Sequence, residues 1–371
     1  MSSTLQLQTD PKVEHAFAHI AYDAPPTVNP DGSIDGDWDE RKTNAEGYTA
    51  FLNVEPRHVY VLVQTPGYAD ASFDVQMPHD DLVTVPLEAL PSLPITLPRV
   101  RIAGRHFVNP AGRWTLCGAD SFQAYDRFLA GEDLRPVLAQ LQALGFNTIR
   151  VFGMDKYIPM QLGRPIFNPY AHPNYYDELP VFCALAESFG LYVYFVVFAD
   201  TGEIVPDEED QVRHFIRTMN ALRLSANTIL SLVNEYTEHA NYVNRSAFPR
   251  PSGIAASSGS AGMDQPTAPP WWDFDEFHPR RDRPGSIKDC CVVDHPNYLS
   301  ADIAVVVDEP DRFGSQGNPD AEYAALQAGA SVESSAGIVF HSKCGVYAQL
   351  LDGETERCAQ AFLHALHGSH R

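Results

Sequence analysis

Basic residues are scarce in this chain of 371 residues. Lys and Arg together number 26 against 48 Asp and Glu, which gives a formal net charge of −22. A surface of this charge repels the phosphates of nucleic acids and of anionic lipids, so neither is expected as a partner. A neutral substrate such as a polysaccharide is compatible with the charge, although the charge alone does not point to one.

Long apolar runs are also missing. No stretch approaches the roughly 18 consecutive apolar residues that a membrane span requires, and the first twenty residues lack the apolar segment of a secretory signal peptide. We therefore expect no membrane partner, and a protein that is cytoplasmic or is released without a signal peptide.

Cysteines are few and scattered, and no pair has C-x-x-C spacing. Several lie inside apolar runs, which favours reduced thiols of the core over a disulfide framework or a zinc ribbon. The six are Cys117, Cys183, Cys290, Cys291, Cys344 and Cys358.

Several motifs that carry chemistry are absent. No G-x-G-x-x-G follows the first predicted strand of the larger domain, which argues against a doubly wound dinucleotide-binding sheet. G-x-S-x-G and H-E-x-x-H are missing too, which argues against an esterase elbow and a zinc protease. The run 235–239 (EYTEH) offers Glu and His on one helix face, but a di-iron bundle needs a second such helix. We predict no metal and no other cofactor.

The chain has the composition of a folded protein, with 44% hydrophobic and 20% charged residues. Its length favours two domains. Residues 1–95 contain short β-rich runs separated by Gly and Pro turns and no helical pattern, which predicts an all-β domain. The Pro-rich stretch 96–104 is the expected linker. The clearest β-rich runs are 50–54, 58–65, 72–77 and 82–87.

Residues 105–371 show a different pattern, in which short apolar runs alternate with segments of helical period. This pattern is typical of βαβ units in a parallel sheet, and eight strands in this length predict a (β/α)₈ barrel. The Gly/Ser/Pro-rich stretch 246–270 is expected to be an insertion. The predicted strands are 114–118, 147–152, 191–198, 228–233, 272–277, 290–293, 303–307 and 336–340. The predicted helices are 132–144, 177–189, 207–223, 319–328 and 354–367.

Two glutamates follow predicted barrel strands. Glu235 follows the fourth strand and Asn234, and Glu309 follows the seventh strand and Asp308. Because the carboxyl ends of barrel strands meet at one mouth, we expect the two side chains to face each other there. Glycoside hydrolysis requires two carboxyl groups that flank the scissile bond. The alternative is that they are solvated loop acids or helix caps.

The first domain resembles the carboxypeptidase-regulatory-like β-sandwich over about 50 residues. The resemblance is carried by TNAEGYTAFLNV and by VYVLVQTPGYADASFDVQM. It implies a small sandwich that serves as a spacer, an assembly module or a weak sugar binder.

From residue 113 onward, the chain resembles the clan A glycoside hydrolases, which include cellulases and β-mannanases. The matching motifs are NTIRVFG, LAESFGLYVYFVVFAD, ILSLVNEYTEHAN, IAVVVDEP and GIVFHS. The resemblance implies a retaining enzyme that cleaves a β-linked glycan by double displacement. Glu235 would be its acid/base and Glu309 its nucleophile. Asn234 would bind the sugar 2-hydroxyl, and Arg150 would keep Glu309 ionised.

The chain departs from the family pattern at two positions. The family usually carries a Trp at the end of the eighth strand, where this chain has His341 and Ser342. It also usually places an aromatic hydroxyl from the sixth strand near the nucleophile, and Tyr298 is the only nearby candidate. These departures keep open a second hypothesis, a non-catalytic glycan-binding or structural protein of a particle or appendage.

Other residues are candidates for binding an oligo- or polysaccharide. Trp271 and Trp272 offer flat rings for sugar stacking, or they pack the neighbouring strand. His278 resembles a histidine that some clan members use to bind sugar hydroxyls, or it is a surface histidine. Asp120 and Asp200 end the first and third strands, where they bind hydroxyls or cap helices. The sequence does not reveal the sugar, the linkage or the oligomeric state.

Overall fold

The computed structural model describes most of the chain. The described residues are 3–12, 17–22, 27–28, 34–35, 38–44, 46–55, 57–64, 71–78, 82–87, 97–223, 225–237, 243–260, 272–278, 303–334 and 336–368. They form two compact units. The first consists of Met1–Leu93, Asp207–Leu224 and Ser246–Ser252, and the second of Pro94–Pro206, Ser225–Arg245 and Gly253–Arg371.

The first unit contains two main β-sheets that share one core. One sheet has the order β6 (Tyr48–Val54), β1 (Ser3–Asp10), β9 (Val83–Pro86), and the other has β5 (Trp38–Lys42), β2 (Phe17–Tyr22), β7 (His58–Gln64), β8 (Ala71–Gln76). A short pair, β3 (Thr27–Val28) and β4 (Ile34–Asp35), and helix α6 (Glu208–Leu222) also belong to this unit. Leu7, Ile20, Phe51 and Val61 are buried in a core to which both sheets contribute. The predicted small all-β sandwich is therefore confirmed.

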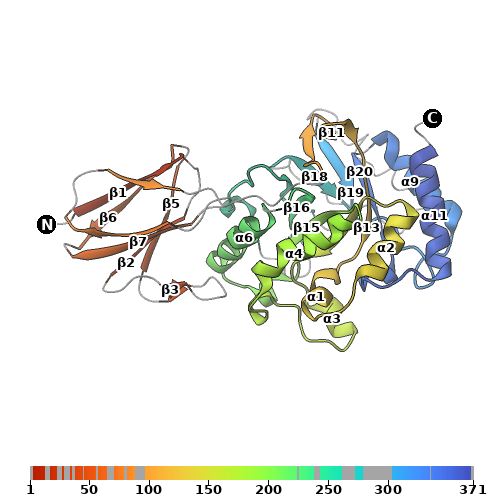
Figure 1. Ribbon diagram of the computed structural model, residues 1–371, viewed down its shortest axis with the longest axis horizontal. Coiled ribbons are helices and arrows are strands. Elements are labelled where there is room, and N and C mark those ends of the chain that lie inside the picture. Colours follow the sequence, from red (N-terminus) through yellow and green to blue (C-terminus); the bar gives the residue numbers. More distant parts are fainter. Residues whose placement is uncertain are drawn as a thin grey trace. The chain divides into compact units, whose positions relative to one another are not determined.

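The second unit is a closed barrel of eight parallel strands, which confirms the predicted (β/α)₈ fold (Figure 1). Every residue of these strands is buried, as expected for parallel strands that are covered on both faces. In barrel order the strands are β13 (Leu116–Asp120), β14 (Thr148–Phe152), β15 (Tyr192–Phe198), β16 (Thr228–Val233), β17 (Ala255–Ser257), β18 (Phe274–Phe277), β19 (Ala304–Val307) and β20 (Gly337–Phe340).

Helices cover the outside of the barrel, and α2 and α4 lie over its strands in Figure 1. Helix α2 buries Val137, Leu138 and Leu141 on one face and ends at Gly145, whose positive φ of 109° suits glycine. Within the described residues, no helix is both long and apolar enough to cross a bilayer. Besides α6, the helical elements of the described residues are α1 (Ala124–Leu129), α2 (Arg135–Leu144), α3 (Tyr157–Gln161), η1 (Pro169–Ala171), α4 (Tyr175–Ser188), α5 (Thr201–Ile204), η2 (Arg245–Ala247), α9 (Ala321–Ser334), α10 (Lys343–Val346) and α11 (Gly353–Gly368).

The fifth and sixth strands differ from the prediction. The fifth strand is β17, which lies inside the stretch 246–270 that the sequence presents as an insertion. The run 272–277, predicted as the fifth strand, contains β18 and is the sixth. The predicted sixth strand, 290–293, lies outside the described residues, and the barrel closes without it because β18 pairs directly with β19. Ala255, Ala256 and Ser257 lack the branched and aromatic side chains that mark strands in a sequence.

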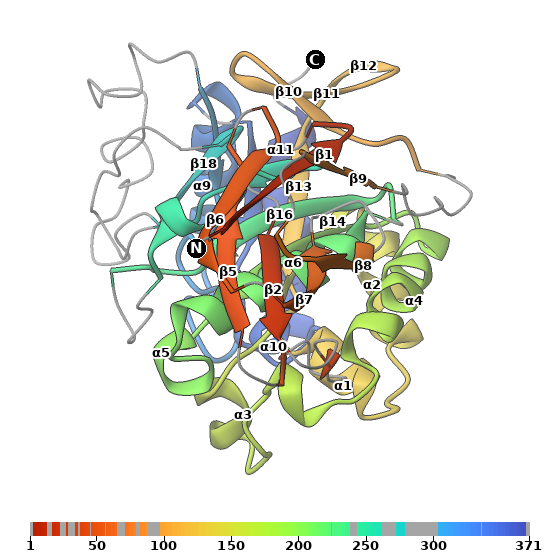
Figure 2. The ribbon, with the colours of Figure 1, turned by 90° about the vertical axis from the view of Figure 1, so that its left-hand side faces the viewer.

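A small antiparallel sheet closes the amino-terminal end of the barrel. It consists of β10 (Arg101–Ala103), β11 (His106–Asn109) and β12 (Gly112–Trp114), so the predicted linker 96–104 runs into its first strand (Figure 2). The buried ring of Phe107 lies 5.2 Å from that of Phe274, the first residue of β18. Side chains fill this end, and in barrels of this kind the chemistry sits at the opposite, carboxyl-terminal end.

The cysteines of the described residues agree with the sequence analysis. Cys117, Cys183, Cys344 and Cys358 are free and buried. The other two, Cys290 and Cys291, lie outside the described residues.

Candidate active site

A cleft of about 510 Å³ opens at the carboxyl-terminal end of the barrel. Its floor includes Phe122 and Phe152, whose rings stack with their centroids 4.0 Å apart. Asn234, Glu235 and Glu309, from the ends of β16 and β19, line the same cleft. The structure therefore brings the two predicted glutamates to one pocket at the end of the barrel where such folds carry their chemistry.

The two glutamates lie close together. One carboxylate oxygen of Glu235, one of Glu309 and one ring nitrogen of His278 all lie within 4.8 Å of one another. Glu235 has a positive φ of 48°, a conformation that costs free energy in a residue other than glycine. Its backbone N–H donates to Ser260 Oγ at 3.0 Å. This strained backbone, held by a residue that follows β17, turns the Glu235 side chain toward the cleft.

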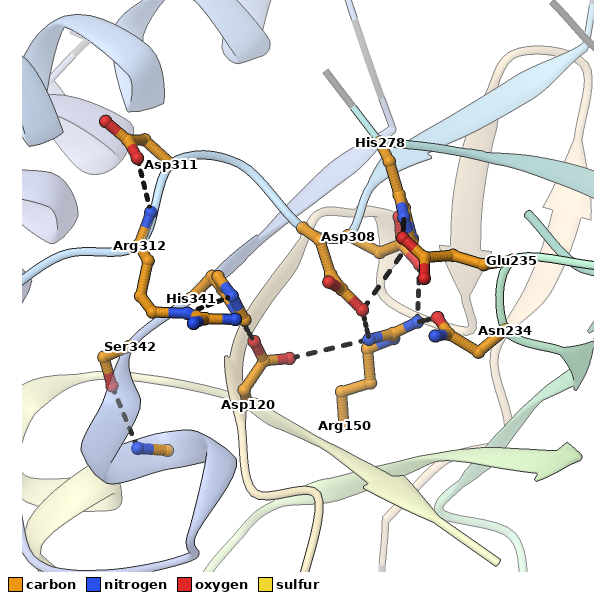
Figure 3. A network of polar contacts seen from close by, with 12 residues as sticks. Asp120, Arg150, Asn234, Glu235, His278, Asp308, Asp311, Arg312, His341 and Ser342 are labelled. Atoms are coloured by element: carbon orange, nitrogen blue, oxygen red, sulfur yellow. Dashed lines mark hydrogen bonds and ion pairs between the residues drawn. The ribbon is translucent and has the colours of Figure 1, made fainter. Parts of the chain in front are cut away.

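Arg150 is the buried cation at the centre of the site (Figure 3). It comes from β14 and is fully inaccessible to solvent. Its Nη1 lies 2.9 Å from Glu309 Oε1, and its Nη2 lies 2.8 Å from Asp308 Oδ2. Nη2 also donates to Asn234 Oδ1 at 2.7 Å. One guanidinium thus fixes the side chains that follow both β16 and β19.

The charges around Glu309 keep it ionised. Burial raises the pKa of Glu309, but the positive charges of His278 and Arg150 outweigh burial and lower this pKa to about 2. A carboxylate that is ionised at neutral pH and lines a cleft is available as a nucleophile.

His278 follows β18 and lies between the two acidic strand ends. Its Nδ1 is 3.0 Å from Glu235 Oε1, and its Nε2 is 3.0 Å from Asp308 Oδ1. Burial lowers the pKa of His278, but the charges of Asp308 and Glu309 outweigh it and raise this pKa well above its usual value. His278 is buried, so it is not the surface histidine that the sequence left open, and it belongs to the sixth strand rather than the fifth.

His341 is fully buried and does not line the cleft. Its Nδ1 contacts Asp120 Oδ2, and its Nε2 accepts a hydrogen bond of 3.0 Å from Arg312 Nε. Asp120 is buried as well. Asp120 and His341, both predicted to bind the glycan, therefore have no surface in the cleft. They instead hold Arg312, which lines it.

The wall beyond the glutamates contains a pair of aspartates, Asp155 and Asp200. Asp200 Oδ2 accepts the backbone N–H of Lys156 at 3.0 Å, and Asp155 Oδ1 accepts that of Ile158 at 3.1 Å. Burial, together with the neighbouring Asp200 carboxylate, raises the pKa of Asp155 well above its usual value. The pair therefore holds the turn that leads into α3, and α3 contributes Tyr157 to the cleft.

Among the charged residues that line the cleft, sequence reasoning missed Asp155 and Arg312. Both lie in loops a few positions beyond a strand end, where their side-chain direction depends on the loop conformation. The predicted Trp272 is half-buried before β18 and does not line the cleft. Trp271 and Tyr298 lie outside the described residues.

Glu235, His278 and Glu309 also have the ligand types of a metal site. Both ring nitrogens of His278 already contact carboxylates, at 3.0 Å each. A bound cation would have to replace one of these contacts, so we assign no metal to the trio.

Comparisons with solved structures find proteins of similar fold whose names include glycoside hydrolases. No protein-family model matches the sequence, and no curated protein matches it. A candidate glycoside hydrolase from Bacteroides vulgatus ATCC 8482 superposes with a TM-score of 0.57 and 11% identity, over 96% of this chain and 75% of its own. The family 5 mannosidase of Rhizomucor miehei gives a TM-score of 0.48 and 11% identity over 73% and 98% of the two chains. The β-1,4-D-mannanase of Cryptopygus antarcticus gives 0.49 and 11% over 71% and 94%. The first superposition shows that this chain shares its fold with that protein.

Proposed function

We propose that the chain is a retaining glycoside hydrolase that cleaves a β-linked glycan with Glu235 and Glu309. The observation that carries the proposal is the approach of the two side chains to within 4.8 Å in one cleft. Retaining enzymes hold their carboxyl groups about 5–5.5 Å apart, whereas inverting enzymes need about 6.5–9.5 Å to admit a water molecule. The short separation therefore favours retention.

In the first step, a Glu309 oxygen attacks the anomeric carbon while the bond to the leaving oxygen breaks. Glu235 gives its proton to that oxygen, and a covalent glycosyl ester of Glu309 remains. In the second step, water loses a proton to Glu235 and attacks the same carbon, which releases Glu309 and regenerates both side chains. The lowered pKa of Glu309, about 2, supports its role because only the carboxylate attacks.

His278 is proposed as the positioning residue for Glu235. Its Nε2 lies 3.0 Å from Asp308 Oδ1, as in an ion pair, and its Nδ1 faces Glu235 Oε1 at 3.0 Å. One proton is shared across the Nδ1–Oε1 contact, either as imidazolium and carboxylate or as imidazole and carboxylic acid. The second arrangement is the one that protonates the leaving group. His278 thus keeps a proton available to Glu235 while the neighbouring Glu309 is a carboxylate.

The fold comparison supports this class of reaction, because the protein from Bacteroides vulgatus that shares the fold is described as a candidate glycoside hydrolase. By the family resemblance, Asn234 would contact the sugar 2-hydroxyl. Its amide oxygen accepts from Arg150, which fixes the orientation of the amide. The sugar and its linkage are not specified by these contacts.

A panel of glycans, followed by anomeric NMR of the products, tests the proposal. The wild type should release a sugar with retained configuration. Glu235→Gln should lower turnover by about 10²- to 10⁴-fold, and Glu309→Gln should abolish it. Glu322→Gln, which removes an exposed carboxylate in the first turn of α9, is the matched control and should leave turnover unchanged.

A second experiment tests the covalent intermediate. Glu235→Ala removes both the acid of the first step and the base of the second. With an aryl β-glycoside whose leaving group needs no proton, sodium azide, which needs no base, should restore turnover and give a β-glycosyl azide. Inverted product, or no effect of either glutamate, would rule out the mechanism. A wild type that binds a glycan but cleaves none would instead favour the non-catalytic hypothesis, with which the missing Trp of the eighth strand is compatible.

A further inference from the structure

Arg312 is the only basic residue among the described residues that line the cleft. The other charged residues of the lining are four acids, Asp155, Asp200, Glu235 and Glu309. Arg312 follows Glu309 by three positions in the loop after β19 and is partly exposed. Arg312 forms no ion pair with Glu235 or Glu309, so its positive charge in the cleft is not explained by the two proposed catalytic carboxylates.

The Arg312 side chain is held through one edge of its guanidinium (Figure 3). Its Nε–H donates to His341 Nε2 at 3.0 Å. A guanidinium has no acceptor, so His341 Nε2 must be unprotonated and the imidazole proton must lie on Nδ1, where it is donated to Asp120. Asp120 and His341 are both buried. They therefore form a fixed support that leaves the two terminal nitrogens of Arg312 for another partner.

No carboxylate among the described residues neutralises Arg312. Its neighbour Asp311 is directed elsewhere, because Oδ1 accepts the backbone N–H of Arg312 at 2.8 Å and Oδ2 accepts from Asn318 Nδ2 at 3.2 Å. Figure 3 shows the Asp311 carboxylate beside the Arg312 backbone nitrogen, with the guanidinium at the far end of the side chain. The other arginine of the site, Arg150, is by contrast paired with Asp308 and Glu309.

A guanidinium with two terminal nitrogens available matches an oxyanion, which it binds through two parallel hydrogen bonds. We propose that Arg312 binds an oxyanion carried by the glycan, either the carboxylate of a uronic acid or a sulfate ester. Binding of the anionic sugar needs no turnover. Only the cleavage of the bound glycan rests on the proposed function. The anionic glycan differs from the neutral polysaccharide with which the net charge of −22 is compatible, because the net charge of the whole chain does not describe the charge at the cleft.

Binding of free sugars to the wild-type protein tests this assignment directly. The probes are glucuronate against glucose, galacturonate against galactose, and glucose 6-sulfate against glucose, measured by calorimetry or ligand-observed NMR. At least one anionic sugar should bind on the order of 10-fold more tightly than its neutral parent, the scale of a charged hydrogen-bonded contact. The carboxylate and sulfate arms then identify which oxyanion is preferred.

Arg312→Gln should reduce the affinity for the anionic sugar to that for the neutral one. Arg357→Gln, which removes an exposed charge on α11, is the matched control and should keep the preference. Arg312→Lys keeps the charge but loses the paired nitrogens, so it should retain only part of the preference. Thermal unfolding verifies that each variant is folded. The wild-type comparison decides the question even if Arg312→Gln does not fold.

The assignment is overturned if the wild type binds no anionic sugar more tightly than its neutral parent, or if a folded Arg312→Gln protein keeps the full preference. These results are distinct from failure of the proposed function. An oxyanion preference without cleavage of any glycan leaves Arg312 as a binding residue and removes the hydrolase proposal. Cleavage of neutral glycans without an oxyanion preference supports the hydrolase proposal and removes the proposed role of Arg312.

Discussion

At the scale of single residues, Arg150 determines the electrostatics of the site. A buried guanidinium is stable only when carboxylates surround it, and here Asp308 and Glu309 lie within 3 Å of its terminal nitrogens. The same contacts keep Glu309 ionised. Stability and the proposed chemistry therefore depend on one set of contacts, and a change at Arg150 should alter both.

Replacing Arg150 with Met should destabilise the protein by about 3–5 kcal/mol, because Asp308 and Glu309 would remain buried without their cation. The pKa of Glu309 should rise as well, since one of the two positive charges that lower it is removed. Urea unfolding measures the first effect and the acid limb of the activity profile the second. Arg135→Met, at an exposed arginine of α2, is the control. An Arg150→Met protein with wild-type stability would contradict this account.

The titrations of Glu309 and His278 predict the pH dependence. Glu309 must be ionised, and its pKa of about 2 places the acid limb of kcat/KM far below neutral pH. The proton shared by His278 and Glu235 must be present, so activity should fall as pH rises through the raised pKa of His278, which lies well above 6.5. His278 likewise stabilises the fold below pH 6.5, and this contribution is lost as pH rises through the raised pKa.

His278→Gln tests the alkaline limb. Glutamine keeps a hydrogen-bonding group near Glu235 but cannot titrate, so the alkaline limb should move away from the wild-type position, together with a lower kcat. If the His278→Gln protein had a lower kcat but the same pH dependence as the wild type, the role of His278 would be structural only.

At the scale of elements, the strands that carry the two glutamates were predicted. Of the two strands between them, β17 was missed, and the run that forms β18 was predicted as the fifth strand instead of the sixth. The runs TILSLV and AVVV form β16 and β19, and their branched side chains predict the strand ends that position Glu235 and Glu309. The three small residues of β17 carry no such signal, so His278 was assigned to the wrong strand. Arg312 was missed because its position depends on a hydrogen bond to His341, a residue 29 positions away.

The connection after β17 gives an element-scale prediction at Gly259. This residue has a φ of 102°, and a Cβ there would lie 2.2 Å from the Val233 carbonyl oxygen at the end of β16. Gly259→Ala should therefore displace the strand end before Glu235, lower the melting temperature and reduce kcat. A destabilisation of about 1–3 kcal/mol is expected from strain of this kind.

Gly329→Ala is the matched control for that substitution. Gly329 lies in α9, and a Cβ there meets nothing within 4 Å. The change should stabilise the protein by about 0.5–1 kcal/mol, because alanine favours a helix over glycine. Thermal unfolding and kcat of both variants decide the matter, and equal effects at the two sites would contradict the proposed close contact at Gly259.

At the scale of the whole molecule, the net charge of −22 and the Arg312 contact act on an anionic glycan in opposite directions. The two effects differ in range. Salt screens the repulsion by distant carboxylates, since the Debye length is about 10 Å at 0.1 M, but it weakens a direct contact inside the cleft much less. The association rate constant should therefore report the net charge, and the dissociation rate constant should report Arg312.

Stopped-flow binding to the Glu235→Gln protein separates these effects. When NaCl is raised from about 10 mM to about 150 mM, the association rate constant of a uronate-containing oligosaccharide should rise several-fold as repulsion is screened. That of a neutral oligosaccharide should stay constant. Adding Arg312→Gln should raise the dissociation rate constant of the uronate oligosaccharide and leave the salt dependence of association unchanged. If association slowed with salt, the cleft would attract anions over a long range, and the local contact of Arg312 could not account for the preference by itself.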